Sequence, residues 1–523
     1  MRAYKYFSSS LLTLFLFAAC AFAQETRHLF FRVTVGPEIT GPVSGRLLIF
    51  VSAGEGAKKV DLTEFQPTAT FVAAKEIYRL APGGSVDVDT DGICFPEPFS
   101  KMKPGDYQAQ AVLDVGHTYA YAGRTEGDWE SAVVPLRGWT PGAGSEPVLT
   151  LTTVAPGRVL PVGKPDAEAA AHLEEMQSAA LTAFWGQPES LKAWVILPPG
   201  YDGTGKIHYP TVYWTHGFGG NLASSKLWGE RIYERMAAGK MPPMIWVMLD
   251  ESLPTGTHEF ADSVNNGPWG EALTKEFIPY LETKYRMDRR ARGRFLQGHS
   301  SGGWATLQLQ VNYPEVFGGT WSTSPDPSDF HDFTGIDLYA PHANVYHRAD
   351  GTAYPLVREH GRVIETFEQF AKTERVLGGY GGQIASFEWV FSPRGEDGRP
   401  LEMFDRDTGV VDPAVVDYWR DHYDLAHIVK ADWAQRGPEL RGKIHVFVGT
   451  ADTFYLDGAA RKFDAVLRGL NANAHFTLIP DRTHRDLYRV GDDRAGLFDE
   501  IGAEMWAVAR GGQTWKGLTS TAH

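Results

Sequence analysis

The stretch "GRFLQGHSSGGWATLQLQVNY", residues 293–313, decides the fold class. A short apolar run of the kind found in buried strands leads into small residues, and a helical pattern follows, so a strand, a sharp turn and a helix are predicted in succession. The turn fits G-x-S-x-G with Ser300 at its centre. Gly298 and Gly302 would let the strand and the helix approach without Cβ clashes. The pentapeptide alone is a weak signal in a glycine-rich chain, and the strand-turn-helix context gives it weight.

The same alternation of strand and helix extends on both sides of this turn. Apolar strands are predicted in "LKAWVILPPGYD", "PTVYWTHG", "MIWVMLD", "GGTWSTS", "KIHVFVGTAD" and "HFTLIP", with amphipathic helices between most of them. Short buried strands joined by helices predict a parallel sheet covered on both faces, with its chemistry at the carboxyl ends of the strands. We therefore predict an α/β fold for residues 161–523.

One connection in this domain is too long for a simple crossover between neighbouring strands. It spans about residues 326–440, and we interpret it as a lid or cap inserted over the site. It is rich in aromatic residues, which predicts a surface able to stack on an aromatic ring of a substrate. These aromatic residues are Phe330, Phe333, Tyr339, Tyr346, Phe387, Trp389, Phe391 and Trp419.

A serine hydroxyl needs a base, and the base needs a carboxylate that holds it in the correct tautomer. After Ser300, "KIHVFVG" leads to Asp452 and "HFTLIP" leads to His484, so both are predicted at the edge of the sheet where Ser300 lies. Asp457 competes for the acid role, but it begins a helix pattern and is expected to serve as an N-terminal cap. Ser300, Asp452 and His484 are the predicted catalytic residues.

The turn that follows "PTVYWT" is rich in glycine and begins at His216. Such a turn presents backbone N–H groups to a developing oxyanion. We assign the two predicted donors to the amides of Phe218 and Ser301. Among the other histidines, His445 and His475 belong to strands, and structural roles are expected for them.

Several pieces of this region resemble a known family. The motifs "LPPGYD", "YPTVYWTHGFGG", "EFIPYLETKYR", "GHSSGG", "GTADTF" and "RTHRDLY" lie between about residues 190 and 490. Together they resemble the esterase family of the α/β-hydrolase fold that includes feruloyl esterases, enterochelin esterases, S-formylglutathione hydrolase and the mycolyltransferases. The resemblance implies Ser300 as nucleophile, Asp452 as acid and His484 as base, with the amides of Phe218 and Ser301 as the oxyanion hole. The β-rich front segment and the long insertion depart from it.

The first third of the chain has a different pattern. Residues 1–23 combine basic residues, an apolar run and a small-residue ending, which predicts a signal peptide and a periplasmic or secreted protein. Cys20 lies in "FAAC", which is similar to a bacterial lipoprotein box, so lipidation there is an alternative. Residues 24–160 contain short apolar runs separated by turn residues, which predicts an all-β, sandwich-like domain. A segment rich in Pro, Gly and charge then leads into the α/β domain.

Composition excludes some partners. The formal net charge is −14, and nucleic acids and anionic membranes need clustered basic residues, so no nucleic acid is an expected partner, and no membrane unless Cys20 is lipidated. After removal of residues 1–23 only Cys94 remains, and no internal disulfide is expected. "DVDTDG" at residues 87–92 resembles the start of an EF-hand loop, but Pro98 stands where its closing Glu should be. We expect no metal and no cofactor.

These observations predict an exported serine carboxylic-ester hydrolase that acts through an acyl-enzyme. Feruloyl or acetyl esters of carbohydrate are the expected substrates, by analogy with the family and from the predicted export. A hydrolase of siderophores or other small esters and an acyltransferase of the same fold remain alternatives. From another class, the chain could be a catalytically inert protein that binds carbohydrate.

Overall fold

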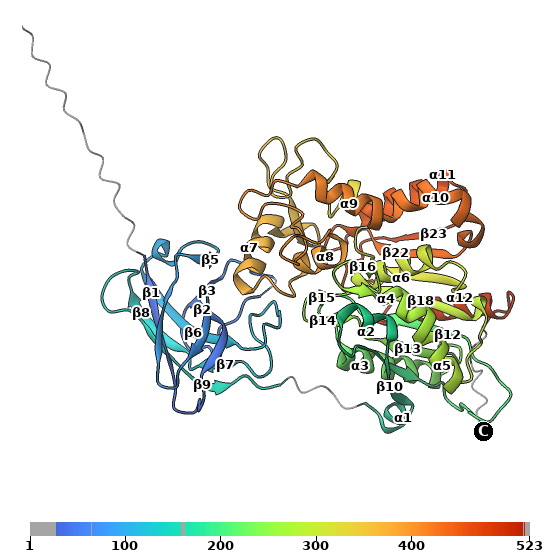
Figure 1. The fold of residues 1–523 in the computed structure, drawn as a ribbon, viewed down its shortest axis with the longest axis horizontal. Coiled ribbons are helices and arrows are strands. Elements are labelled where there is room, and N and C mark those ends of the chain that lie inside the picture. The colour runs from blue at the N-terminus through green and yellow to red at the C-terminus, as the bar shows by residue number, and fades with distance from the viewer. Residues whose placement is uncertain (1–27, 64, 158–162, 516, 518–523) are drawn as a thin grey trace, which may run out of the picture.

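The computed structural model describes residues 28–63, 65–157, 163–515 and 517 (Figure 1). The predicted signal peptide and Cys20 lie outside these residues. A β-rich unit formed by the first described residues lies at one end of the molecule, and a larger unit with strands and helices lies at the other. None of the described helices is long and apolar enough to cross a bilayer.

The β-rich unit is a nine-stranded sheet with the order β4-β1-β9-β7-β6-β2-β3-β5, and β8 pairs with β6. Alternate side chains of β1 are buried, as expected for a strand with one face on a core. Most neighbouring strands are antiparallel, whereas β1 and β9 run parallel. The strands are β1 (Phe30–Val35), β2 (Val43–Ala53), β3 (Thr70–Leu80), β4 (Ser85–Asp89), β5 (Ile93–Phe95), β6 (Gly105–Asp114), β7 (Trp129–Ser131), β8 (Val134–Trp139) and β9 (Val148–Val154).

The second unit contains an eight-stranded mixed sheet with the order β10-β11-β13-β12-β18-β19-β22-β23. From β13 to β23 all neighbours are parallel, so the carboxyl ends of these strands share one edge. The strands are β10 (Ala171–Gln177), β11 (Ser190–Ile196), β12 (Thr211–Thr215), β13 (Ile245–Leu249), β18 (Arg294–His299), β19 (Gly319–Thr323), β22 (Ile444–Gly449) and β23 (His475–Ile479). Every residue of β12, β13 and β19 is buried, which confirms the predicted alternation of buried strands with helices.

Helices cover both faces of this sheet. One apolar core joins strand residues to α3 (Leu222–Ala237) and α12 (Gly496–Ala509). A second core, on the other face, includes residues of α2 (Ala179–Trp185), α5 (Ile278–Lys284) and α6 (Ser301–Asn312). The remaining elements are α1 (Pro165–Ala169), α4 (Trp269–Glu271), α11 (Leu456–Gly469), the π-helical turn η2 (Ala272–Phe277), the 3-10 turns η1 (Phe99–Lys101), η3 (Ala291–Gly293) and η4 (Phe330–Asp332), and the short strands β14 (Ser252–Leu253), β15 (Gly256–Thr257), β16 (Asp262–Ser263) and β17 (Gly267–Pro268).

The long connection between β19 and β22 has secondary structure and a core of its own. Its elements are β20 (Pro355–Glu359), β21 (Arg362–Thr366), α7 (Phe367–Leu377), α8 (Gln383–Phe391), α9 (Pro413–Tyr423) and α10 (Leu425–Leu440). Phe330, Phe391 and Trp419 are buried against one another, with ring centroids 5.2–5.9 Å apart. Much of the aromatic content of this segment therefore holds the segment together.

Helix α7 also packs against β3 and β5 of the β-rich unit, on the side that faces the second unit (Figure 1). Leu48 and Phe50 of β2 share an apolar cluster with Val376 and Leu377 of α7. The Arg46 guanidinium donates hydrogen bonds to the carbonyl oxygens of Arg375 and Val376, both at 2.7 Å, at the C-terminal end of that helix. A cation is favourable there because the last carbonyls of a helix lack partners within the helix.

Candidate active site

Ser300 occupies a strained turn between β18 and α6. Its φ of 61° and ψ of −125° are conformations that a non-glycine residue rarely adopts. A Cβ at Gly298 would lie 2.2 Å from the carbonyl oxygen of Gly302, and one at Gly302 would lie 2.3 Å from that of His216. The two glycines are therefore required by the close approach of three chain segments, as the sequence predicted.

His484 and Asp452 form a buried pair at the same edge of the sheet. The Nδ1 of His484 lies 3.0 Å from Oδ2 of Asp452. Burial alone would raise the pKa of Asp452, but the charge of His484 and its hydrogen bond outweigh burial, so the pKa is lowered. An ionised Asp452 fixes the tautomer of His484 with the proton on Nδ1, which leaves Nε2 as the basic nitrogen.

The ring of His484 is held between two aromatic neighbours. Its centroid lies 4.4 Å from that of His299, the residue before Ser300, and 5.0 Å from that of Phe454. Burial and the nearby His484 lower the pKa of His299 to about 3, so His299 is neutral. His299 therefore serves as packing for His484 next to the nucleophile.

Asp457 lies apart from this pair. Its carboxylate accepts a 3.0 Å hydrogen bond from Arg358 and forms an ion pair with Arg461. The cap role predicted for Asp457 is wrong. Asp452 instead accepts hydrogen bonds from the amides of Phe454 and Leu456, where α11 begins. The reason is that the carboxylate of Asp452, in the turn after β22, already lies at the start of the following helix.

The glycine-rich turn after β12 lies against the nucleophile. A Cβ at Gly217 would be 3.0 Å from the Cβ of Ser300, so only a glycine allows this approach. Ser301 is the first residue of α6, where an amide has no acceptor within its helix. The predicted oxyanion donors, the amides of Phe218 and Ser301, thus belong to two segments that meet at Ser300.

The side chain of His216 links this turn to the end of β13. Its Nε2 lies 3.2 Å from Oδ1 of Asp250, and its Nδ1 lies 2.9 Å from the carbonyl oxygen of Gly217. Burial lowers the pKa of His216, but Asp250 and Glu251 outweigh burial and raise it. The sequence named His216 only as the first residue of the turn, and the structure gives its side chain a role in holding that turn.

A further carboxyl group, Asp326, was missed by the sequence analysis. Ser301 Oγ donates a 2.6 Å hydrogen bond to Asp326 Oδ2, and Ser300 Oγ lies 3.5 Å from Asp326 Oδ1. Burial raises the pKa of Asp326 to about 6. Its position shortly after "GGTWSTS", at the same edge as the other strand ends, was the signal that could have found it.

Two cavities flank this constellation. A cavity of about 1040 Å³ is bordered by residues of the β-rich unit, the glycine-rich turn, the insertion and the segment after β23; they include Tyr119, Tyr121, Phe218, Gln383, Phe454 and Arg485. A small apolar cavity of about 30 Å³ lies beside Asp326 and is bordered by Phe333, Phe367, Phe387 and Leu456, among others. Of the eight aromatic residues predicted for a stacking surface, Phe333 and Phe387 border the small cavity and none borders the large one.

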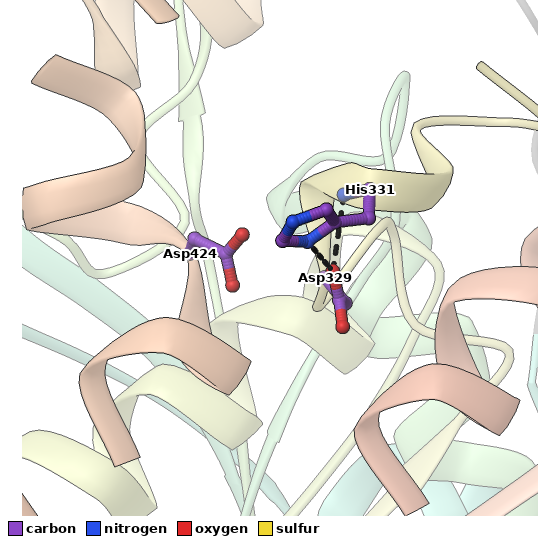
Figure 2. A group of neighbouring side chains, drawn as sticks. All are labelled: Asp329, His331 and Asp424. Carbon is purple, nitrogen blue, oxygen red and sulfur yellow. Dashed lines mark hydrogen bonds and ion pairs between the residues drawn. The ribbon is translucent and has the colours of Figure 1, made fainter. Parts of the chain in front are cut away.

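One group of side chains has the composition of a metal site (Figure 2). Ligand atoms of Asp329, His331 and Asp424 lie within 4.8 Å of one another. However, Asp329 accepts hydrogen bonds from the ring and the amide of His331, and Asp424 accepts from the amides of Phe330 and His427. The carboxylates therefore already cap the local turns, so the contacts support a structural role for the group.

The remaining motifs have structural contacts. His445 stacks on Trp321 with ring centroids 4.2 Å apart, and burial lowers its pKa to about 4, while His475 lies exposed at the start of β23. In the segment that resembled an EF-hand, Asp87 pairs with Arg32, and Asp91 accepts hydrogen bonds from the amides of Leu29 and Ser100.

Comparison with known proteins places the chain in a family. The sequence profile of a family described as "Putative esterase" matches residues 187–468, more than half of the chain. The chain belongs to this esterase family. It is a carboxylic ester hydrolase, and the predicted resemblance is confirmed. The matched range contains Ser300 and Asp452 and ends before His484. No curated relative matches the sequence.

Solved structures similar to this esterase include three enzymes. A ferulic acid esterase is 15% identical, with 65% of this chain and 97% of that chain covered and a TM-score of 0.39. A ferulic acid esterase from Anaeromyces mucronatus, solved with ferulic acid, is 15% identical, with coverage of 64% and 89% and a TM-score of 0.35. An S-formylglutathione hydrolase from Agrobacterium tumefaciens is 14% identical, with coverage of 65% and 94% and a TM-score of 0.35.

Proposed function

We propose that this esterase is an exported serine hydrolase that acts through an acyl-enzyme, with Ser300 as nucleophile, His484 as base and Asp452 as the acid that orients it. The observation that carries the proposal is the buried hydrogen bond of 3.0 Å between His484 and Asp452, at the sheet edge where Ser300 occupies its strained turn. Export rests on the residue pattern at positions 1–23.

In the first half of the proposed reaction, Ser300 Oγ attacks the ester carbonyl carbon while its proton passes to Nε2 of His484. The carbonyl oxygen becomes an oxyanion and accepts hydrogen bonds from the amides of Phe218 and Ser301. As the intermediate collapses, the bond to the alcohol oxygen breaks and His484 donates its proton to that oxygen. Asp452 stays ionised and stabilises the imidazolium.

In the second half, a water molecule gives a proton to His484 and attacks the acyl-enzyme. The bond between Ser300 and the acyl group breaks, the serine oxygen recovers its proton from His484, and the carboxylic acid leaves. If a sugar hydroxyl took the place of water, the same steps would give an acyltransferase.

Carbohydrate esters of feruloyl or acetyl groups are our proposed substrates. The similar ferulic acid esterase whose structure contains ferulic acid motivates the feruloyl group. We further propose that residues 326–440 act as a lid, since Phe333, Phe387 and Gln383 of this segment border the two cavities. Siderophore esters and other small esters remain the alternative substrates.

The test is hydrolysis of p-nitrophenyl acetate and methyl ferulate by the wild type and by Ser300→Ala. The variant should retain the fold and lose nearly all turnover. Only the rate enhancement that comes from substrate binding and the oxyanion hole should remain. Turnover close to that of the wild type would refute the serine mechanism and favour the inert binding protein. A panel of feruloyl, acetyl, siderophore and thioester substrates, with Ser300→Ala as the blank, then ranks the substrate classes.

A further inference from the structure

We propose that the β-rich unit forms one wall of the subsite for the leaving group, and that Tyr119 and Tyr121 select a carbohydrate as the alcohol part of the ester. This inference rests on the proposed function, because it uses His484 as the group that protonates the leaving alcohol. It assigns a role in substrate binding to a unit that lies outside the matched family region.

The wall is built by the connection between β6 and β7, which reaches the glycine-rich turn of the other unit. The ring of Tyr119 lies 6.1 Å from that of Phe218, centroid to centroid, and its Cβ lies next to Gly381 of the insertion. The ring of Tyr121 lies 6.3 Å from that of Phe370, and its hydroxyl donates a 3.1 Å hydrogen bond to Glu365. Both tyrosines border the cavity of about 1040 Å³.

The unit that carries this wall is fixed to the insertion by packing and by hydrogen bonds. Leu48 and Phe50 pack on α7 through an apolar cluster, and Arg46 binds the last carbonyls of that helix. The tyrosines are therefore held at the cavity by the same helix, α7, that includes Phe370, the neighbour of the Tyr121 ring. A rigid wall positions a ligand with little loss of conformational entropy.

The chemistry of ester cleavage decides which part of the substrate occupies this cavity. His484 must reach the alcohol oxygen in order to protonate it, so the leaving group lies on the side of the site next to His484. Arg485, the residue after His484, borders the large cavity and not the small one, whereas Phe454, which packs on the His484 ring, borders both. The large cavity thus receives the alcohol, and the small apolar cavity beside Asp326 lies toward the acyl group.

The lining of the large cavity favours a sugar. Aromatic rings from four segments line it together with polar side chains such as Asn221, Ser252 and Gln383. Aromatic faces can cover the apolar C–H faces of a sugar, while hydroxyl and amide groups bind its hydroxyls. The volume is at the upper end of the roughly 300–1,000 Å³ that is typical of ligand sites, so a leaving group larger than methanol is accommodated.

The experiment compares two esters of the same acid, a feruloylated arabinoxylan oligosaccharide and methyl ferulate. Tyr119→Ala and Tyr121→Ala should each lower kcat/KM for the oligosaccharide ester about tenfold more than for the methyl ester, mainly through KM, because one stacking contact of about 1–1.5 kcal/mol is lost. Tyr119→Phe, which keeps the ring, should restore most of the preference. Tyr78→Ala is the matched control, since Tyr78 is 84% exposed on β3 of the same unit.

Equal losses on both esters, or none, would overturn the inference, as would a similar effect of Tyr78→Ala. Failure of the proposed function gives a different result, because wild type and Ser300→Ala would then be indistinguishable on methyl ferulate. In that case calorimetric binding of the free oligosaccharide to Ser300→Ala, with and without Tyr119→Ala, still tests the wall. Affinity unaffected by Tyr119→Ala would refute it.

Discussion

The carboxyl group of Asp326 lies 3.5 Å from the hydroxyl of Ser300, although the two residues are 26 positions apart in the chain. The amide of Asp326 also donates a 3.2 Å hydrogen bond to the carbonyl oxygen of Ser300. The site therefore contains two buried carboxyl groups in different surroundings. The interaction and hydrogen bond with His484 keep Asp452 ionised, while burial favours the neutral form of Asp326.

Asp326→Asn should change how stability depends on pH. The pKa of Asp326 is raised from 3.8 to about 6, so between about pH 4 and 6 the unfolded chain releases a proton that the folded chain retains. The contribution of Asp326 to the free energy of unfolding therefore falls as pH rises through this window, by up to about 3 kcal/mol. Relative to the wild type, the variant should gain stability from pH 4 to pH 7, as measured by denaturant unfolding.

Asp452→Asn serves as the control, because it should change the pH dependence of the free energy of unfolding in the opposite direction. The pKa of Asp452 is lowered, so its ionised form stabilises the fold above the pKa of the unfolded state, and this contribution is lost as pH falls. A pH dependence of the Asp326→Asn variant parallel to that of the wild type would show that folding does not raise the pKa of Asp326.

Asp452→Asn and Asp457→Asn should differ sharply in activity. Loss of the Asp452 carboxylate leaves His484 in the wrong tautomer, and turnover should fall by a factor on the order of 10⁴. Asp457 pairs with Arg358 and Arg461, so its replacement should change turnover little and cost about 1 kcal/mol of stability. Ester turnover and thermal unfolding of the purified variants provide the measurement. The reverse ranking would assign the acid role to Asp457.

Gly302→Ala should impair folding and turnover together. The added Cβ would lie 2.3 Å from the carbonyl oxygen of His216 and 2.6 Å from that of Thr215, and backbone atoms cannot move aside cheaply. We expect a loss of about 3 kcal/mol in stability and a displaced oxyanion turn. Gly351→Ala is the control, because Gly351 has a positive φ of 82° with open space around it and should cost only about 1 kcal/mol. Equal effects of the two substitutions would contradict the steric explanation.

Arg46→Ala should weaken the contact between the β-rich unit and α7. The substitution removes two hydrogen bonds to the carbonyls at the end of the helix, and each such bond to a charged donor contributes about 1.5–3 kcal/mol. We expect the thermal unfolding of the β-rich unit to separate from that of the α/β unit in calorimetry. Arg32→Ala, which removes an exposed ion pair with Asp87, should leave a single transition. Identical traces for both variants would show that the apolar cluster alone holds the units together.

Local patterns made much of the site predictable. The strand, turn and helix around Ser300 follow from a few consecutive residues, since small residues and apolar periodicity act over short distances along the chain. Asp452 and His484 could be named because each lies a few residues after an apolar strand, and parallel strands end at one edge. The aromatic insertion was recognisable by its length, but its rings were assigned to a binding surface, whereas Phe330, Phe391 and Trp419 pack in a core.

The sequence by itself thus determined the esterase-like α/β unit, the strained serine turn and the candidates for base and acid, because short-range patterning encodes them. Only the tertiary structure decided that Asp326 lies beside Ser300, that Arg46 binds the end of α7 and that Tyr119 faces Phe218. These contacts join segments that are distant in the chain. Which residues meet in these contacts depends on how the sheets and helices pack, and the residue pattern within one segment does not determine that packing.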